Sequence, residues 1–211
     1  VMKFIDLFAG IGGFRIALEN TDSKCVYSSE WDKYAQITYE HNFGELPEGD
    51  ITKVDISRIP DHDILCGGFP CQAFSISGKQ GGFKDVKGTL FFDIARIVKE
   101  KNPKVIILEN VRNLGRHDDG RTLNTIKNVL DELGYNIFHK ILNSSHYGVP
   151  QNRQRIFIIG LKKSHKSKVF EFPDPTYEEV FLDDILEPNV PKHFFVERED
   201  IEFKENSILV K

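Results

Sequence analysis

A cysteine lies where this chain could carry a nucleophile. Residues 67–72 read Gly-Gly-Phe-Pro-Cys-Gln, and they directly follow an apolar run, His62–Cys66, that is typical of a short buried strand. In open α/β sheets, ligands bind beyond the carboxyl ends of the strands, which is where Cys71 is expected. Because a free cysteine is more often a small core residue, its type alone does not assign chemistry to Cys71.

A carboxylate and two arginines occupy comparable positions further along the chain. The fully apolar run Val105–Leu108 predicts a central parallel strand that leads directly into Glu109. Arg153 and Arg155 are two residues apart at the start of another predicted strand, so alternation puts both side chains on one face. From there they could clamp a phosphate or a base edge. Glu109 is well placed for chemistry, and an acid that caps a strand against solvent is the simpler alternative.

The N-terminal segment predicts a nucleotide-type turn. An apolar run over residues 3–8 is followed by Gly10, Gly12 and Gly13 at the start of a predicted helix. Glycines at such a turn let the backbone approach a ligand at the helix N-terminus. The spacing differs from the dinucleotide G-x-G-x-x-G and no phosphate-binding lysine follows, which weakens the NAD and P-loop interpretations. A purely structural turn stays open as an alternative.

Three later residues suit an adenosine. Glu30 follows the glycines by about 20 residues, the usual position of an acid that binds ribose hydroxyls. Trp31 offers an aromatic face for a purine, against the alternative that this single tryptophan packs in the core. Asp50 is expected at the end of a further strand. Together these groups predict a pocket for an adenosine-containing cofactor that has no pyrophosphate.

The elements that must position these residues alternate between strand and helix. Further strands are expected at 25–29, 135–142 and 156–159, and helices at 32–42, 90–98 and 121–133. This order predicts an α/β fold with a doubly wound, mostly parallel sheet and helices on both faces. The glycine-rich segment 75–88 is typical of a loop that closes over a substrate.

The regular alternation ends after Gly160. From Glu171 onward there are 12 acids against 4 Lys and Arg residues, although the whole chain has a net charge of only −4. We therefore divide the chain into an α/β domain, residues 1–165, and an acidic, proline-interrupted extension, residues 166–211. The charge asymmetry suggests a basic working face and an acidic tail, and a merely solvated charged loop is an equally open alternative.

Composition places the chain in a reducing compartment. The three cysteines (Cys25, Cys66 and Cys71) make neither a disulfide framework nor a C-x-x-C pair. A thiol near an acid, with no matching His and Asn, does not fit a cysteine protease. We find no charged-then-apolar leader and no apolar run long enough to span a membrane. A cytoplasmic protein without a metal site or a membrane partner is expected.

Taken together, these motifs resemble those of the bacterial C5-cytosine DNA methyltransferases, most strongly the small GCGC-methylating members. The order and spacing agree over about residues 3–160. The matching motifs are Phe8 to Gly13, Glu30-Trp31, Gly49-Asp50, Gly68 to Gln72, Glu109-Asn110-Val111 and Gln151-x-Arg153-x-Arg155. The resemblance implies a class I S-adenosylmethionine-dependent methyltransferase fold.

The resemblance also implies a mechanism. Cys71 would add as a thiolate to C6 of a flipped cytosine in double-stranded DNA, which makes C5 nucleophilic enough to accept a methyl group from S-adenosylmethionine. Glu109 would hydrogen-bond N3 and the exocyclic amine, and Arg155 would hold O2. Arg153 would support the loop or bind a phosphate. The product would be S-adenosylhomocysteine.

The remaining contacts follow from the same resemblance. Cofactor contacts are expected from Phe8, Gly10, Gly12, Gly13, Glu30, Trp31, Asp50, Ile51, Pro70 and Leu90. Contacts to the substrate DNA are expected from Phe69, Gln72, Ser75, Ser77 and Lys79.

One departure from the family pattern shapes the expectation. Family members usually continue into a target-recognition domain and a C-terminal Gly-Asn-Ser/Thr-Val motif that completes the cofactor pocket, and the sequence contains neither. We therefore expect a catalytic subunit or fragment that needs a complementing polypeptide. A catalytically silent module that docks on a partner methyltransferase, and a tRNA cytosine-5 methyltransferase, are the alternatives.

Overall fold

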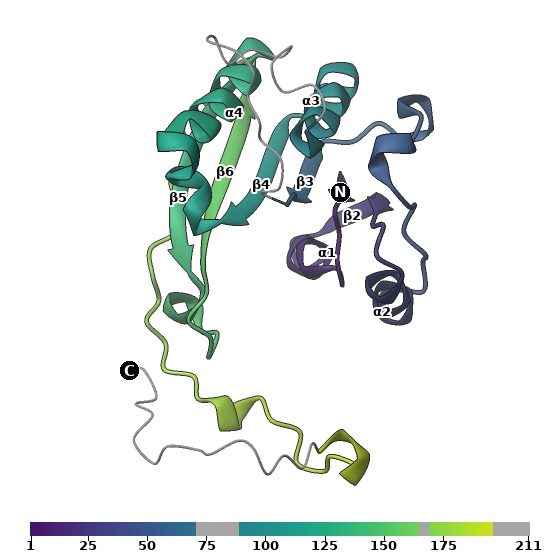
Figure 1. The fold of residues 1–211 in the computed structure, drawn as a ribbon, viewed down its shortest axis with the longest axis vertical. Coiled ribbons are helices and arrows are strands. Elements are labelled where there is room, and N and C mark those ends of the chain that lie inside the picture. The colour runs from purple at the N-terminus through teal and green to yellow at the C-terminus, as the bar shows by residue number, and fades with distance from the viewer. Residues whose placement is uncertain (71–88, 165–168, 196–211) are drawn as a thin grey trace.

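The computed structural model describes residues 1–70, 89–164 and 169–195, which include a six-stranded mixed sheet (Figure 1). The strand order is β2-β1-β3-β4-β6-β5. The strands are β1 Met2–Leu7, β2 Ser23–Ser29, β3 Ile64–Gly68, β4 Val105–Val111, β5 Tyr135–Asn143 and β6 Gln154–Lys162. The first four strands pair in parallel, whereas β6 runs antiparallel to both β4 and β5.

Within the described residues four α-helices connect the strands, and local signals account for the ends of α2. They are α1 Gly13–Glu19, α2 Lys33–Phe43, α3 Leu90–Lys101 and α4 Arg121–Glu132. The side chain of Asp32 caps α2 by accepting hydrogen bonds from the backbone of Tyr34 and Ala35. Gly44 ends that helix in the left-handed conformation that glycine tolerates.

The sheet has a hydrophobic core on each face. The larger core joins Leu7, Leu65 and Leu108 of the sheet to the apolar sides of α3 and α4. A smaller cluster on the opposite face is built around Phe4 and Cys66 and is covered by α1. The predicted doubly wound sheet with helices on both faces is therefore confirmed, with the antiparallel β6 as its departure from parallel pairing.

Two local expectations were wrong. Asp50 does not end a strand: it caps the short 3-10 helix Ile51–Lys53, because its carboxylate accepts from the backbone and hydroxyl of Thr52. Arg153 precedes β6 instead of opening it, and its backbone N–H donates to Asn143. Arg153 is therefore not a strand residue, although its charge, like that of Arg155, acts on the carboxyl of Glu109.

Part of the extension lies against the domain. Phe170 packs 6.0 Å from the ring of Phe138 in β5, and the backbone N–H of Thr176 donates to His146 over 2.9 Å. Further along, the chain leaves the sheet, as Figure 1 shows, and its apolar side chains Phe181, Phe194 and Phe195 are exposed. No helix among the described residues is long and apolar enough to cross a membrane.

Candidate active site

The sheet brings the predicted reactive groups to one edge. Gly68, the last residue of β3, pairs with Glu109 of β4, and Val111 pairs with Arg155 at the start of the antiparallel β6. The segment that leads to Cys71 therefore leaves the sheet beside Glu109 and Arg155. Cys71 itself lies outside the described residues, as do the predicted DNA contacts Gln72, Ser75, Ser77 and Lys79.

Glu109 and Arg155 form a sheltered ion pair. Arg155 Nε lies 2.9 Å from Glu109 Oε1, and the two side chains are only 23% and 24% exposed, respectively. Burial raises the pKa of Glu109, and the positive charges of Arg155 and Arg153 oppose that rise. A carboxyl group with a raised pKa is suited to sharing a proton with a ligand in this position.

Asn110, next to Glu109, is hydrogen-bonded to the segment that leads to Cys71. Its side chain is on a residue only 2% exposed, and Nδ2 donates to the carbonyl of Phe69 over 2.7 Å. Because Phe69 stands two residues before Cys71, this bond fixes where the loop leaves the sheet. The role of Asn110 was not predicted, although its place between Glu109 and Val111 in a family motif was a usable signal.

The residues flanking the loop have different surroundings. The ring of Phe69 is buried and packs 5.9 Å from Phe91 of α3, which leaves only its backbone for the predicted DNA contact. Pro70 is exposed, and Leu90 is partly buried at the first position of α3. Their cofactor contacts stay predictions.

Glu30 directly follows β2, on the part of the sheet edge where the cofactor is expected to bind. Its carboxylate accepts from the backbone N–H of Gly10 and of Asp32, each over 2.8 Å. The residue is buried, so these bonds hold the glycine turn against the start of α2. Gly10 and Gly12 have φ angles of 56° and 95°, a left-handed backbone that favours glycine.

The two aromatic residues expected at the adenosine lie in different environments. Trp31 is 78% exposed, so it does not pack in the core as the alternative interpretation proposed. Phe8 is partly buried against the larger core, and a side chain at Gly67 would contact its ring. Phe8 thus links the glycine turn to the end of β3.

The other two cofactor candidates discussed for this side, Ile51 and Asp50, also have structural roles. Ile51 is buried in the larger core. Asp50 accepts two bonds from Thr52 and lies 3.3 Å from Lys53 Nζ, and these contacts lower its pKa. Asp50 is therefore an ionised acceptor, as recognition of an adenine amine would require.

Asp6 is a buried acid that was not predicted. Both of its carboxyl oxygens lack a hydrogen-bond partner within the described part of the chain. Burial raises its pKa to about 8, and the nearby Arg15 opposes that rise. An acid inside the apolar run at residues 3–8 was the available signal.

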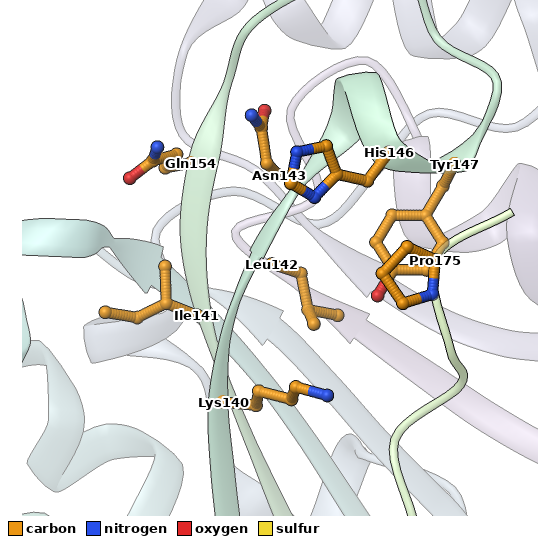
Figure 2. A pocket seen from close by; sticks show the side chains of 8 residues that line it. All are labelled: Lys140, Ile141, Leu142, Asn143, His146, Tyr147, Gln154 and Pro175. Carbon is orange, nitrogen blue, oxygen red and sulfur yellow. The ribbon is translucent and has the colours of Figure 1, made fainter. Parts of the chain in front are cut away.

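A pocket of about 270 Å³ lies along β5, next to the segment that contains His146 and Tyr147 (Figure 2). It is lined by Lys140, Ile141, Leu142, Asn143, His146, Tyr147, Gln154 and Pro175. Leu142 is the partner of Arg155 in the pairing of β5 with β6. Asn143 Oδ1 accepts from Arg153, so this pocket wall also holds the turn that carries Arg153.

Neither a metal site nor a reactive second thiol is evident in the described ranges. Over residues 1–70, 89–164 and 169–195, no group of three or more His, Cys, Asp and Glu side chains could hold a metal ion. Cys25 and Cys66 are free and buried, and burial raises the pKa of both thiols. Such thiols are inert packing residues.

Solved structures define the class of the fold. A protein described as a DNA modification methyltransferase encoded within a prophage (E. coli) matches with a TM-score of 0.73 and 26% identity, over 91% of this chain and 56% of that chain. A DNMT2 variant from Spodoptera frugiperda matches with a TM-score of 0.73 and 24% identity, over 93% of this chain and 63% of that chain. The fold is that of the class I methyltransferases.

The sequence narrows the class to one family. The chain belongs to the family of C-5 cytosine-specific DNA methylases, whose profile matches residues 2–209. It is 57% identical to the type II methyltransferase M.HhaI of Haemophilus parahaemolyticus, over 95% of this chain and 62% of that protein. It is 54% identical to M.HpaII of Haemophilus parainfluenzae, over 94% of this chain and 57% of that protein.

These matches confirm the resemblance and also measure its extent. The family implies S-adenosylmethionine as the cofactor, as predicted. The chain spans only about three fifths of the length of the two Haemophilus relatives. The activity and the partners of a whole enzyme are therefore matters of proposal for this chain.

Proposed function

We propose that this chain is the catalytic portion of a DNA (cytosine-5-)-methyltransferase. It would transfer a methyl group from S-adenosylmethionine to C5 of a cytosine that is flipped out of double-stranded DNA. The observation that carries the proposal is the sheltered Glu109–Arg155 pair at the sheet edge where the cysteine segment leaves β3. A bacterial cytoplasmic location is part of the proposal, since the relatives are type II methyltransferases from Haemophilus.

In the proposed reaction, the Cys71 thiolate forms a bond to C6, and the displaced ring electrons are delocalised toward N3. Glu109 hydrogen-bonds N3 and the exocyclic amine, and its raised pKa favours the protonated form that can donate to N3. Arg155 keeps the Glu109 carboxyl in place and is the candidate ligand for O2. After C5 is methylated, loss of its proton restores the ring and expels Cys71 as thiolate.

The described residues fit the proposed cofactor. When bound, S-adenosylmethionine supplies an electrophilic methyl group. The glycine turn would approach the methionine part, Glu30 would bind the ribose, and Trp31 and Asp50 would bind the adenine. The exposed ring of Trp31 is consistent with a site completed by a ligand.

A complementing polypeptide that carries the target-recognition domain and the last cofactor motif is the second part of the proposal. On the sheet face that bears Glu109, the side chains of Ile107, Phe157 and Leu161 are only partly buried. The extension separately exposes apolar side chains such as Phe181, Phe194 and Phe195. Both features are expected of a surface that another segment covers.

A tritiated-methyl transfer assay on duplex DNA tests the proposal. The chain is assayed alone and with a polypeptide that corresponds to the C-terminal two fifths of its relatives. We expect transfer with that polypeptide and none from a Cys71→Ser variant. Absence of transfer in every combination, or full activity of Cys71→Ser, would contradict the proposal. Duplex DNA and tRNA as competing substrates distinguish the tRNA alternative.

A further inference from the structure

Helix α2 is attached at its N-terminal end to the residues expected around the adenosine. The backbone N–H of Asp32, its N-cap, donates to Glu30 Oε1 over 2.8 Å. One turn later, Gln36 Nε2 donates to the carbonyl of Glu30 over 2.5 Å. The first turn of α2 therefore fixes both the side chain and the backbone of Glu30.

The opposite end of the same helix is attached to the glycine turn. Asn42 Nδ2 donates to the carbonyl of Ile11 over 3.5 Å. Phe43, the last residue of α2, packs so closely on Gly12 that a Cβ atom at position 12 would overlap its ring. Phe43 therefore limits where the turn can move.

Arg15, a residue of α1, also contacts Phe43. Its residue is only 7% exposed, and its guanidinium lies 4.5 Å from the centroid of the Phe43 ring. Nη1 lies 2.9 Å from Glu45 Oε2 and 3.3 Å from the hydroxyl of Tyr39. A stacked guanidinium held by an acid beyond the end of α2 joins α1 and α2 around one ring.

We propose that Phe43 and Arg15 are positioning residues of the cofactor site. With them, α2 acts as a strut that braces the glycine turn at Gly12, in addition to the direct hydrogen bond from the Gly10 N–H to Glu30. Neither side chain touches the cofactor: Phe43 acts through Gly12, and Arg15 acts through Phe43. The inference rests on the proposed use of S-adenosylmethionine, whose ribose would bind at Glu30 and whose methionine part would bind at the glycine turn.

The test compares Phe43→Leu and Arg15→Met with two reference variants. Phe43→Tyr keeps the ring and is the conservative rescue. Phe138→Leu removes an equivalent, partly buried ring from β5, away from the cofactor site. S-adenosylhomocysteine binding is followed by the fluorescence of Trp31, the single tryptophan, and unfolding by urea gives the stability of each variant.

If the strut is lost, the folded protein binds S-adenosylhomocysteine more weakly. If a substitution only destabilises the fold, the folded fraction decreases but the Kd of the folded protein does not change. We expect the Kd of Phe43→Leu and Arg15→Met to rise by about tenfold, since small misplacements of binding groups carry large penalties. Phe43→Tyr and Phe138→Leu should keep the Kd of the unchanged protein. Equal Kd values for Phe43→Leu and Phe138→Leu would overturn the inference.

Amide hydrogen exchange separates this inference from the proposed function, because it needs no ligand. Phe43→Leu should raise the exchange rate of residues 10–13 and leave that of β3 and β4 unchanged. If the unchanged protein fails to bind S-adenosylhomocysteine even with the complementing polypeptide present, the proposed cofactor is contradicted. If exchange over residues 10–13 is the same in both proteins, the strut itself is contradicted.

Discussion

Glu109 is the residue whose chemical state matters most for the proposed reaction. Its carboxyl is held by Arg155 and its pKa is raised by burial, two effects that act in opposite directions on its proton. This balance is what a group needs if it is to donate to N3 and then stabilise the charge on the ring. An acid that merely capped the strand against solvent would be exposed and unpaired.

The first prediction concerns Glu109→Gln. The amide cannot share a proton with N3, and it leaves the partly buried Arg155 without its partner charge. We expect methyl transfer in the complemented enzyme to fall by about 100-fold or more. Glu100→Gln, the same change at an exposed position of α3, is the control and should keep full activity. Equal rates for the two variants would exclude a proton-sharing role for Glu109.

Asp6 gives a prediction about pH and stability. Its folded-state pKa of about 8 lies above the ordinary value of an aspartate, so the folded protein binds a proton that the unfolded chain releases. The unfolding free energy therefore decreases as the pH rises from about 4 to 8, by at most about 1.4 kcal/mol per pH unit for this group.

Asp6→Asn should remove that dependence. The unfolding free energy of both proteins is measured with urea at pH 5 and pH 8. The change between the two pH values is compared, and not the absolute unfolding free energy, because burying the amide of Asn lowers stability by itself. We expect the difference between the two pH values to be smaller in the variant. Parallel behaviour of the two proteins would show that Asp6 ionises normally.

At the scale of elements, the glycine turn shows why the two adjacent glycines differ. Gly12 has a φ of 95° and faces the Phe43 ring, whereas at Gly13 the backbone is not left-handed and a Cβ atom would meet no other atom within 4 Å. Gly12→Ala must therefore adopt a strained backbone and displace a packed ring.

We predict that alanine at these two positions changes the unfolding free energy by different amounts. Gly12→Ala should lower the unfolding free energy by about 1–3 kcal/mol. Gly13→Ala, at the first position of α1, should change it by less than about 1 kcal/mol in either direction. Thermal unfolding of both variants checks the difference, and similar losses at the two positions would contradict the packing described for Phe43.

Much of this architecture could be predicted from the sequence, because several strands are runs rich in apolar residues and the helices α3 and α4 each have a clear apolar stripe. The direction of β6 could not, since a short strand carries no signal of its pairing partner. Asp50 and Arg153 were misplaced for a related reason: a side-chain cap and a strand boundary depend on contacts that spacing does not encode. Asn110 and Phe43 act through long-range contacts of the same kind.

At the scale of the whole molecule, the chain combines a formed reactive edge with surfaces that suit a covering partner. The sheet edge holds Glu109, Arg155 and Glu30 with their neighbours in place. The relatives are longer by about two fifths of their own length, and the extension presents exposed phenylalanines. Under the proposed function, methyl transfer depends on the complementing polypeptide, whereas the packing of the described sheet does not.

The most direct test of the central claim is covalent trapping at Cys71. Duplex DNA with 5-fluorocytosine at the target position lacks the C5 proton whose loss releases the enzyme, so a methylated adduct should accumulate. With the complementing polypeptide and S-adenosylmethionine, we predict an adduct that mass spectrometry locates on Cys71 and that Cys71→Ser does not form. An adduct on another residue, or methylation of ordinary DNA without any trapped adduct, would contradict the account.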